Sequence, residues 1–163
     1  MSGIVVRPAA TEHVAALVAF NQAMAVESEG KALDPAVLER GVHHLLSQPE
    51  DGFYLVAEQD TEPGPVRGAL PEPELAGSLL VTFEWSDWRD GRFWWIQSVY
   101  VRPEFRRRGV YRAMHQRVRD LARQDGRACG LRLYVERENT GAMATYQAMG
   151  MVETHYRLYE EEF

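Results

Sequence analysis

The chain alternates between two hydrophobic periods, and the two best-defined segments follow one another. Residues 93–101 are rich in aromatic and β-branched side chains, which favours a strand. Pro103 ends that strand, because proline has no N–H to donate to a neighbour. Apolar residues then recur at helical spacing, at Val110, Met114, Val118, Leu121 and Ala122. The pattern therefore predicts a strand at 93–101 and a helix from Gly109 to about Gln124.

Hydrophobic periodicity, together with cap and turn residues, predicts the other elements. Thr11 is a candidate N-cap for a first helix, and Asp34-Pro35 has the cap and first-turn proline of a second. Residues 86–92, with Asp90-Gly91, read as a hairpin turn, and the Pro- and Gly-rich residues 60–74 as a long turn or flexible loop. The pattern also predicts a helix at 140–149 and strands at 4–7, 53–58, 75–85, 131–135 and 152–159. These elements predict a single α+β domain over residues 1–163, with a mixed sheet.

Three arginines and one glycine lie between the central strand and its helix. The first N–H groups of a helix have no intrahelical partner, and with the positive end of the helix dipole they favour a phosphate. Gly109 lets the backbone approach closely, and Arg106, Arg107 and Arg108 add charge and donors. The segment lacks the Gly-Lys-Ser/Thr ending of a triphosphate loop and the three glycines of a dinucleotide fingerprint. It therefore suggests another diphosphate ligand, although a solvated basic turn gives the same pattern.

Two motifs carry a resemblance to a known family. Arg106, Gly109 and, imperfectly, Tyr111 resemble the acetyl-CoA motif Gln/Arg-x-x-Gly-x-Gly/Ala of the GNAT N-acetyltransferase superfamily. Residues 139–151 match the family's second pattern at all five positions: Asn139, Ala142, Tyr146, Gly150 and Met151. Tyr111 stands where the family has Gly or Ala, which requires its side chain to point away from the diphosphate.

The resemblance implies a GNAT-like, mostly antiparallel sheet flanked by about four helices, and acetyl-CoA as co-substrate. The pantetheine would pair with the backbone of Val99 and Val101, and the diphosphate with amides from Arg107 to Arg112. Tyr146 matches the family's usual general acid, with a core tyrosine as the alternative, and Asn139 either caps a helix or also touches the cofactor. The implied cofactor-binding residues are Val99, Tyr100, Val101, Arg106, Arg107, Arg108, Gly109, Val110, Tyr111, Arg112, Asn139 and Tyr146.

The general base is less defined. Many relatives place a carboxylate on the central strand, where this chain has Trp95, Gln97 and Ser98. Glu84, on the preceding strand, is the best carboxylate candidate, with an exposed strand-end glutamate, a water relay or an amine that arrives already neutral as alternatives. His13, His43 and His44 could supply an imidazole. Four tryptophans bracket the same hairpin, and we expect two to pack and the others to line an acceptor pocket: Trp85, Trp88, Trp94 and Trp95.

Composition limits the classes of binding partner that we expect. The net charge of −6 disfavours generic nucleic-acid binding and weakly favours a cationic acceptor. The one cysteine, Cys129, suits a reducing compartment, and we expect an inert, packed thiol. No metal-ligand spacing, signal peptide or bilayer-spanning stretch is evident, so we expect a cytoplasmic, metal-independent protein with no membrane partner.

The leading hypothesis is an acetyl-CoA-dependent N-acetyltransferase in which a primary amine attacks directly within a ternary complex. The acceptor would be a small molecule or a peptide, and the protein a monomer or homodimer. The alternative is a non-catalytic acyl-CoA-binding or sensor module of the same fold, favoured by the missing carboxylate on the central strand and by Tyr111.

Overall fold

The computed structural model describes residues 3–59 and 74–163, which include parts of two compact units, Met1–Leu133 and Tyr134–Phe163. The first unit carries the sheet and most of the core, and the second carries one helix and the C-terminal segment. The expectation of a single domain over residues 1–163 stays a prediction.

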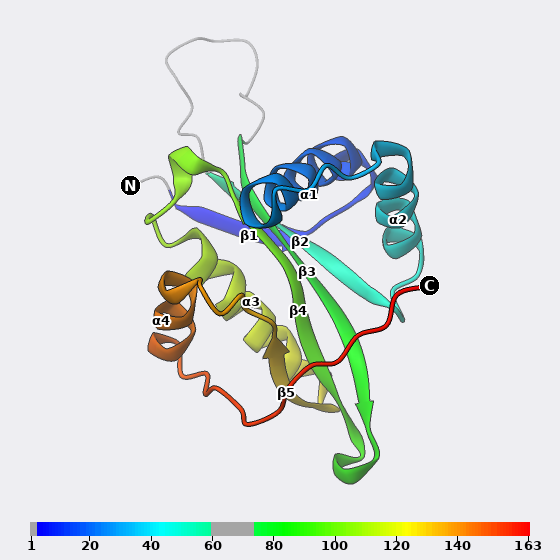
Figure 1. The fold of residues 1–163 in the computed structure, drawn as a ribbon, viewed down its shortest axis with the longest axis vertical. Helices are drawn as coiled ribbons and strands as arrows, with labels where there is room; N and C mark the ends of the chain where they lie inside the picture. The colour runs from blue at the N-terminus through cyan, green and yellow to red at the C-terminus, as the bar shows by residue number, and fades with distance from the viewer. Residues whose placement is uncertain (1–2, 60–73) are drawn as a thin grey trace. The chain divides into compact units, whose positions relative to one another are not determined.

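The sheet has five strands in the order β1-β2-β3-β4-β5 (Figure 1). All neighbours are antiparallel except β4 and β5, which are parallel. The predicted α+β class with a mostly antiparallel sheet is therefore confirmed. The strands are β1 (Ile4–Pro8), β2 (Gly52–Gln59), β3 (Glu74–Ser86), β4 (Gly91–Val101) and β5 (Ala128–Leu133).

Helices cover both faces of the sheet. Helices α1 (Val14–Glu29) and α2 (Pro35–Ser47) pack on one face, where Leu17 and Val42 meet Tyr54 and Val56 of β2. Helix α3 (Val110–Asp125) packs on the opposite face (Figure 1). The fourth helix, α4 (Thr140–Ala148), belongs to the second unit.

The apolar stripe of α3 explains its position. Val110, Met114 and Val118 are almost fully buried and join one cluster with Val81 and Ile96 of the sheet. Burial of such a side chain contributes about 1.5–3 kcal/mol, so this stripe fixes the helix against the sheet. The beginning of α3, immediately after the basic turn, is held in place as a consequence.

Local chemistry explains several boundaries. Asp34 Oδ1 accepts hydrogen bonds from the backbone N–H groups of Ala36 (2.8 Å) and Val37 (3.4 Å), which confirms the predicted cap of α2. Strand β4 ends at Val101 and Pro103 opens a short 3₁₀ turn (Pro103–Phe105), as the missing proline N–H requires. A second 3₁₀ turn, Asp87–Arg89, closes the hairpin between β3 and β4.

Four expectations need correction or lie outside the described residues. Thr11 is not an N-cap, because the chain enters a 3₁₀ turn (Thr11–His13) whose cap position is Ala10. Residues 152–159 form no strand, because an alternating pattern gives strand propensity but not the neighbouring strand that a ladder needs. Strand β5 begins at Ala128, earlier than predicted. The loop predicted at 60–74 lies outside the described residues, except Glu74, which opens β3.

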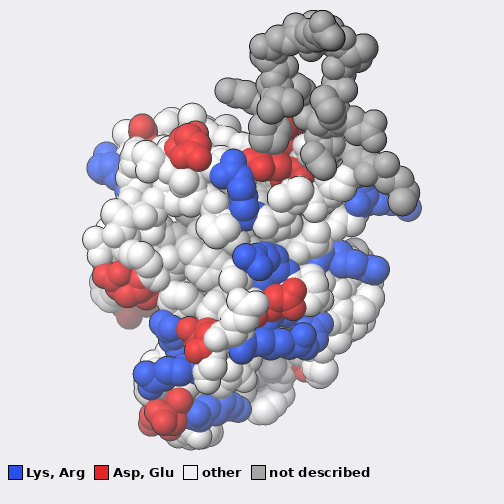
Figure 2. Space-filling view, turned by 180° about the vertical axis from the view of Figure 1, so that it is seen from behind, with Lys and Arg blue, Asp and Glu red and all other residues white. Residues whose placement is uncertain are grey.

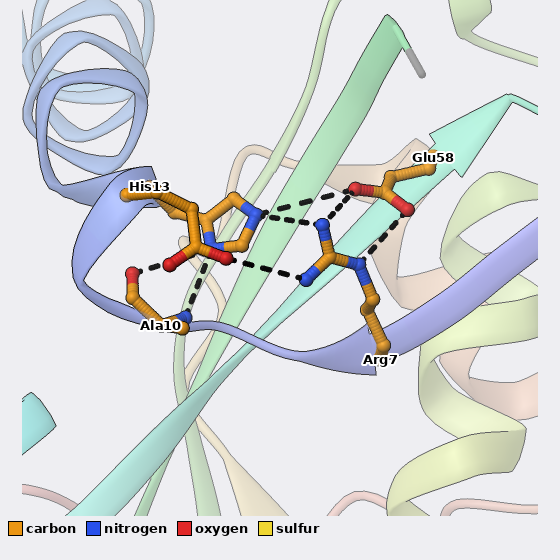
Figure 3. A network of polar contacts seen from close by, with 5 residues as sticks. Arg7, Ala10, His13 and Glu58 are labelled. Atoms are coloured by element: carbon orange, nitrogen blue, oxygen red, sulfur yellow. Dashed lines mark hydrogen bonds and ion pairs between the residues drawn. The ribbon is translucent and has the colours of Figure 1, made fainter. Parts of the chain in front are cut away.

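A polar network ties the edge strand β1 to β2 and to the start of α1 (Figure 3). Arg7 binds Glu58 through two hydrogen bonds, Nε to Oε2 at 2.9 Å and Nη2 to Oε1 at 2.6 Å. The same Nη2 lies 3.0 Å from His13 Nε2, and His13 Nδ1 accepts a hydrogen bond from the N–H of Ala10. Glu58 is 7% exposed, so the guanidinium compensates a carboxylate that would be costly to bury alone.

His115 is the buried histidine of α3, 1% exposed. Neither of its ring nitrogens has a hydrogen-bond partner among the described residues. Burial, and to a lesser extent the charge of Arg119, lower the pKa of His115. The folded protein therefore keeps this imidazole neutral at a pH where an exposed histidine is charged.

We expect the free energy of unfolding to fall as the pH drops below about 6.5, the ordinary histidine pKa, because the unfolded chain then takes up a proton that folded His115 refuses. Urea unfolding at pH 6.5 and 5.5 measures this loss, expected at about 1 kcal/mol per pH unit for one group. The His115→Leu variant should lose most of this pH dependence, whereas His43→Leu, at an exposed site on α2, should keep it. Equal pH dependence in the wild type and His115→Leu would contradict this assignment.

Candidate functional site

A bulge in β4 marks the site. Val81 of β3 pairs with Ile96, but Leu79, two residues earlier, pairs with Val99, so β4 has one extra residue between them. Pairing between β4 and β5 also stops at Ile96, although β4 continues to Val101. Bulges re-aim side chains and end pairing, and they are common beside functional sites. Beyond Ile96, β4 therefore has a sheet neighbour on one side only within the described residues.

The backbone of Val99 and Val101 faces the opened side. The N–H of Arg102 donates to the carbonyl of Ala76 on β3, at 3.0 Å. Because successive residues of a strand direct their N–H and C=O groups to opposite sides, the groups of Val101 and Val99 point away from β3. The carbonyl of Val101 accepts a hydrogen bond from Arg106 Nε at 2.9 Å. Val99, by contrast, presents its backbone to an edge where β5 is no longer paired.

The basic turn leads directly into α3. Arg107 (φ +61°) and Gly109 (φ +83°) both have left-handed backbone conformations, and the three arginines and Gly109 are exposed. No side chain caps α3, so its first N–H groups have no capping acceptor in the described residues. A Cβ at position 109 would meet no atom within 4 Å, so glycine is favoured here by φ rather than by space.

Arg106 is held on both sides. Its Nη2 pairs with Glu27 Oε2 on α1 at 2.5 Å, while its Nε binds the Val101 carbonyl. Tyr100 donates to the other oxygen of Glu27 at 3.3 Å, and its ring lies 5.3 Å from that of Phe20 on α1. Burial, followed by the charge and hydrogen bond of Glu27, raises the pKa of Tyr100. This arrangement links the end of α1 to the start of the basic turn.

The side chain of Tyr111 does not cover the beginning of α3. Its ring packs against the apolar core under the sheet and lies 5.8 Å from the ring of His115. The side chain therefore points inward, as its place in the motif requires.

Glu84 lies in a polar cluster on the sheet face that α1 and α2 share. Its Oε1 accepts a hydrogen bond from Arg132 of β5 at 2.6 Å, and its Oε2 accepts one from the indole N–H of Trp95 at 2.8 Å. Arg132 also lies over the ring of Phe93, 3.5 Å from its centroid. Both carboxylate oxygens of Glu84 therefore already accept a hydrogen bond within this cluster.

The four tryptophans separate by face and by exposure. Trp94 is buried with Phe53 and Phe83 under the sheet, with ring centroids 5.4 and 5.3 Å apart. Trp95 lies on the opposite face, while Trp85 and Trp88, near the hairpin tip, are 53% and 86% exposed. Trp94 therefore packs in the core, whereas Trp95 lies on the polar face with Glu84.

The histidines considered as bases are engaged elsewhere. His13 belongs to the network of Arg7, and His44 Nε2 lies 2.7 Å from Asp51 Oδ2. His43 is exposed on α2, with Nε2 4.0 Å from Glu39 Oε1. Cys129 is a half-buried free thiol on β5.

The second unit carries the other sequence motif. Asn139 caps α4, since its Oδ1 accepts a hydrogen bond from the N–H of Ala142 at 3.1 Å. Tyr146 lies on α4 two turns later, half-buried, and burial raises the pKa of its phenol. Its proton is therefore retained at neutral pH, as a proton donor requires.

On the face drawn in Figure 2, basic side chains are interspersed with acidic ones. Within residues 3–59 and 74–163, no group of three or more His, Cys, Asp or Glu residues could hold a metal ion. The same residues contain no helix that is long and apolar enough to cross a membrane.

Sequence reasoning missed three features of this site: the bulge, Arg132 and Glu27. A bulge changes register by one residue and leaves little trace in hydrophobic periodicity. Arg132 reaches Glu84 across 48 positions of sequence, and Glu27 reaches Arg106 across 79. Such long-range ion pairs have no local signal, although charged residues within apolar segments are a reason to look for one.

The chain resembles known proteins over most of its length. Residues 21–151 match the Acetyltransferase (GNAT) family. A possible acetyltransferase from Clostridium difficile 630 is 38% identical, with a TM-score of 0.84 over 98% of this chain and 97% of that one. The aminoglycoside N-acetyltransferase AAC(6')-Iy, solved with CoA, is 16% identical with a TM-score of 0.76, over 99% of this chain and 96% of that one, and shares the fold.

A curated relative is the thialysine N-epsilon-acetyltransferase of Bos taurus, 36% identical over 103 residues. The match covers 62% of this chain and 57% of that protein, so it spans little more than half of the relative's length. Together, the family match over residues 21–151 and the fold place the protein: the chain belongs to the acetyltransferase (GNAT) family, whose members include N-acetyltransferase enzymes.

Proposed function

We propose that the protein transfers the acetyl group of acetyl-CoA to a primary amine, by direct attack of the amine within a ternary complex. The observation that carries the proposal is the juxtaposition of the opened β4 edge with the uncapped start of α3. The first offers backbone groups to the amide-rich pantetheine, and the second offers N–H groups and arginines to the diphosphate. When bound, acetyl-CoA supplies an activated thioester as acetyl donor.

The residues of the donor site have separate roles in this proposal. Val99 pairs with the pantetheine, while Arg106, held by Glu27, keeps the turn next to β4. Arg107, Arg108 and the amides from Gly109 to Arg112 bind the diphosphate. This division differs from the sequence expectation for Val101, whose carbonyl already accepts a bond from Arg106.

Tyr146 is the proposed general acid. Its reference pKa of about 10 exceeds that of a thiol, about 8.5, so donation to the departing thiolate is uphill by about 2 kcal/mol in reference terms. Burial, which raises the pKa of Tyr146, increases this cost and requires compensation from the site. Asn139 caps the first turn of the helix that carries the phenol.

The acceptor in this proposal is a small-molecule or peptide amine. The name of the bovine relative supports a side-chain amine, since that protein is a thialysine N-epsilon-acetyltransferase. A typical alkyl amine has a pKa near 10.4, so it must lose a proton before attack. We propose that water removes this proton and that Glu84, whose two oxygens already accept hydrogen bonds, acts mainly on acceptor binding. We further propose that the reaction needs no metal and takes place in the cytoplasm, in a monomer or homodimer.

A non-catalytic acyl-CoA-binding module is the second candidate, favoured by the engagement of both Glu84 oxygens. Release of free thiol from acetyl-CoA in the presence of a panel of primary amines decides between the two. Amine-dependent release supports the transferase. Tight acetyl-CoA binding without release for any amine would instead support the binding module.

The Gly109→Asp variant should bind acetyl-CoA at least about tenfold more weakly, a loss of about 1.4 kcal/mol. The added carboxylate would face the diphosphate, and aspartate tolerates the left-handed conformation. Gly109→Asn is the matched control, because asparagine has nearly the same shape without the charge. Calorimetry that gave equal affinity for the wild type and a folded Gly109→Asp would rule out the diphosphate site.

The Tyr146→Phe variant should lower kcat by about 10² to 10⁴, the usual range for positioned acid catalysis, and leave acetyl-CoA affinity nearly unchanged. Single-turnover kinetics with calorimetric binding separate the two quantities. A wild-type kcat in this variant would make Tyr146 a packing residue.

The Glu84→Gln variant should raise KM for the amine while keeping the wild-type shape of the pH–rate profile. A general base would behave differently, because its loss depresses the rate most at neutral pH and matters less as the pH approaches the amine's own pKa. Initial rates between pH 6.5 and 9.5 at several amine concentrations distinguish these outcomes. Recovery of the rate at high pH would identify Glu84 as the base.

A further inference from the structure

Arg132 has a fixed position beside the opened strand edge. Its guanidinium lies over the ring of Phe93 and donates to Glu84, and its side chain is 32% exposed. Phe93 can occupy this place because its strand partner is Gly130, where a Cβ would come within 2.8 Å of the ring. The stacking and the ion pair orient a planar fork of donors before any ligand arrives.

Most donors of this fork remain available. Glu84 is the one hydrogen-bond partner of the Arg132 side chain within the described ranges, and the bond uses a single nitrogen. A guanidinium has N–H donors on all three nitrogens, in a geometry that matches a carboxylate. Glu84, 47% exposed, also keeps lone pairs that can accept a hydrogen bond from an ammonium group. The pair thus presents a cation and an anion side by side.

Gln97 is a further polar side chain on the sheet face that carries Arg132 and Glu84. Trp95 pairs with Arg132 across the β4–β5 ladder, and Gln97 lies two residues further along β4, on the same side as Trp95 and next to the bulge. The Gln97 side chain is exposed and donates to Thr82 Oγ1 at 2.9 Å, which leaves its carbonyl oxygen as an acceptor. Trp95, which is paired with Arg132, and Gln97 are two residues apart on β4, which is a separation of roughly 7 Å along the strand.

We infer that Arg132 and Glu84 bind the zwitterionic head of an amino acid whose side-chain amine is the acetyl acceptor. The α-carboxylate lies on Arg132 and the α-ammonium on Glu84. A lysine-length side chain then runs along Trp95, and its terminal amine reaches Gln97 and the opened edge of β4. This inference rests on the proposed function and names its acceptor class. In the transfer itself, the ammonium group first gives one proton to water, and the neutral nitrogen then bonds to the acetyl carbon as the C–S bond of the thioester breaks. The leaving thiolate takes a proton from Tyr146, and the nitrogen's second proton restores the phenol.

Matched amines test this inference directly. L-lysine and 1,5-diaminopentane share a terminal amine and chain length, but only L-lysine has a carboxylate. The wild type should use L-lysine at least about tenfold better by kcat/KM, which is about 1.4 kcal/mol. In Arg132→Gln this preference should disappear through a raised KM for L-lysine, with kcat on L-lysine nearly unchanged.

Arg127→Gln is the matched control. Arg127 also lies over an aromatic ring, that of Trp85 at 5.2 Å, and faces an acid, Asp90, at 3.8 Å. Trp85 is on the other sheet face, so this variant should keep the preference for L-lysine. If Arg132→Gln does not fold, Arg132→Lys retains the charge without the fork and should lose most of the preference.

A wild type that uses both amines equally, or an Arg132→Gln enzyme that still prefers L-lysine, would overturn the inference while leaving the transferase intact. If neither amine is acetylated, the proposed function fails for this acceptor class. Calorimetry with the CoA-bound protein then still tests whether Arg132 contributes to L-lysine binding. L-lysine binding that weakens at least about tenfold in Arg132→Gln supports the site. Equal L-lysine binding in both proteins, or no binding to the wild type, refutes it.

Discussion

The interruption of hydrogen bonding at Ile96 is the constraint on which the site depends. Backbone N–H and C=O groups require partners, and a strand inside a sheet normally finds them on both sides. Here one extra residue in β4 changes its register with β3, and β5 leaves β4 at the same point. The backbone of Val99 is then available to a ligand with amide groups of its own. In the proposed function, this interruption of the ladder is the edge that binds the donor.

The position of α3 makes this edge useful. The buried stripe of Val110, Met114 and Val118 fixes the helix under the sheet, so its uncapped start lies a few residues beyond the opened strand. Arg106 joins the two parts, since it binds the Val101 carbonyl and the carboxylate of Glu27. Hydrophobic packing thus sets the distance between the two elements that we propose bind the donor, and polar contacts set their orientation.

Periodicity and turn chemistry were sufficient to predict most of the fold. The stripe of α3, the cap at Asp34 and the stop at Pro103 are local signals, and each was confirmed. The segment 152–159 shows the limit, because its alternating pattern was read as a strand but the segment forms none. Glu84 shows a second limit, since its ion pair with Arg132 depends on the β4–β5 pairing and has no local sequence signal. Sequence motifs were enough to propose a donor site, whereas the proposal of an acceptor face needed the structure.

Amide hydrogen exchange with and without acetyl-CoA tests the central claim most directly, because it reads each backbone group of the opened edge. On saturation with acetyl-CoA, exchange should slow at Val99 and at the first amides of α3, Val110 to Arg112, while the β4–β5 ladder before Ile96 changes little. Binding without added protection anywhere in residues 97–112 would contradict the account, because the donor would then be held by another part of the chain.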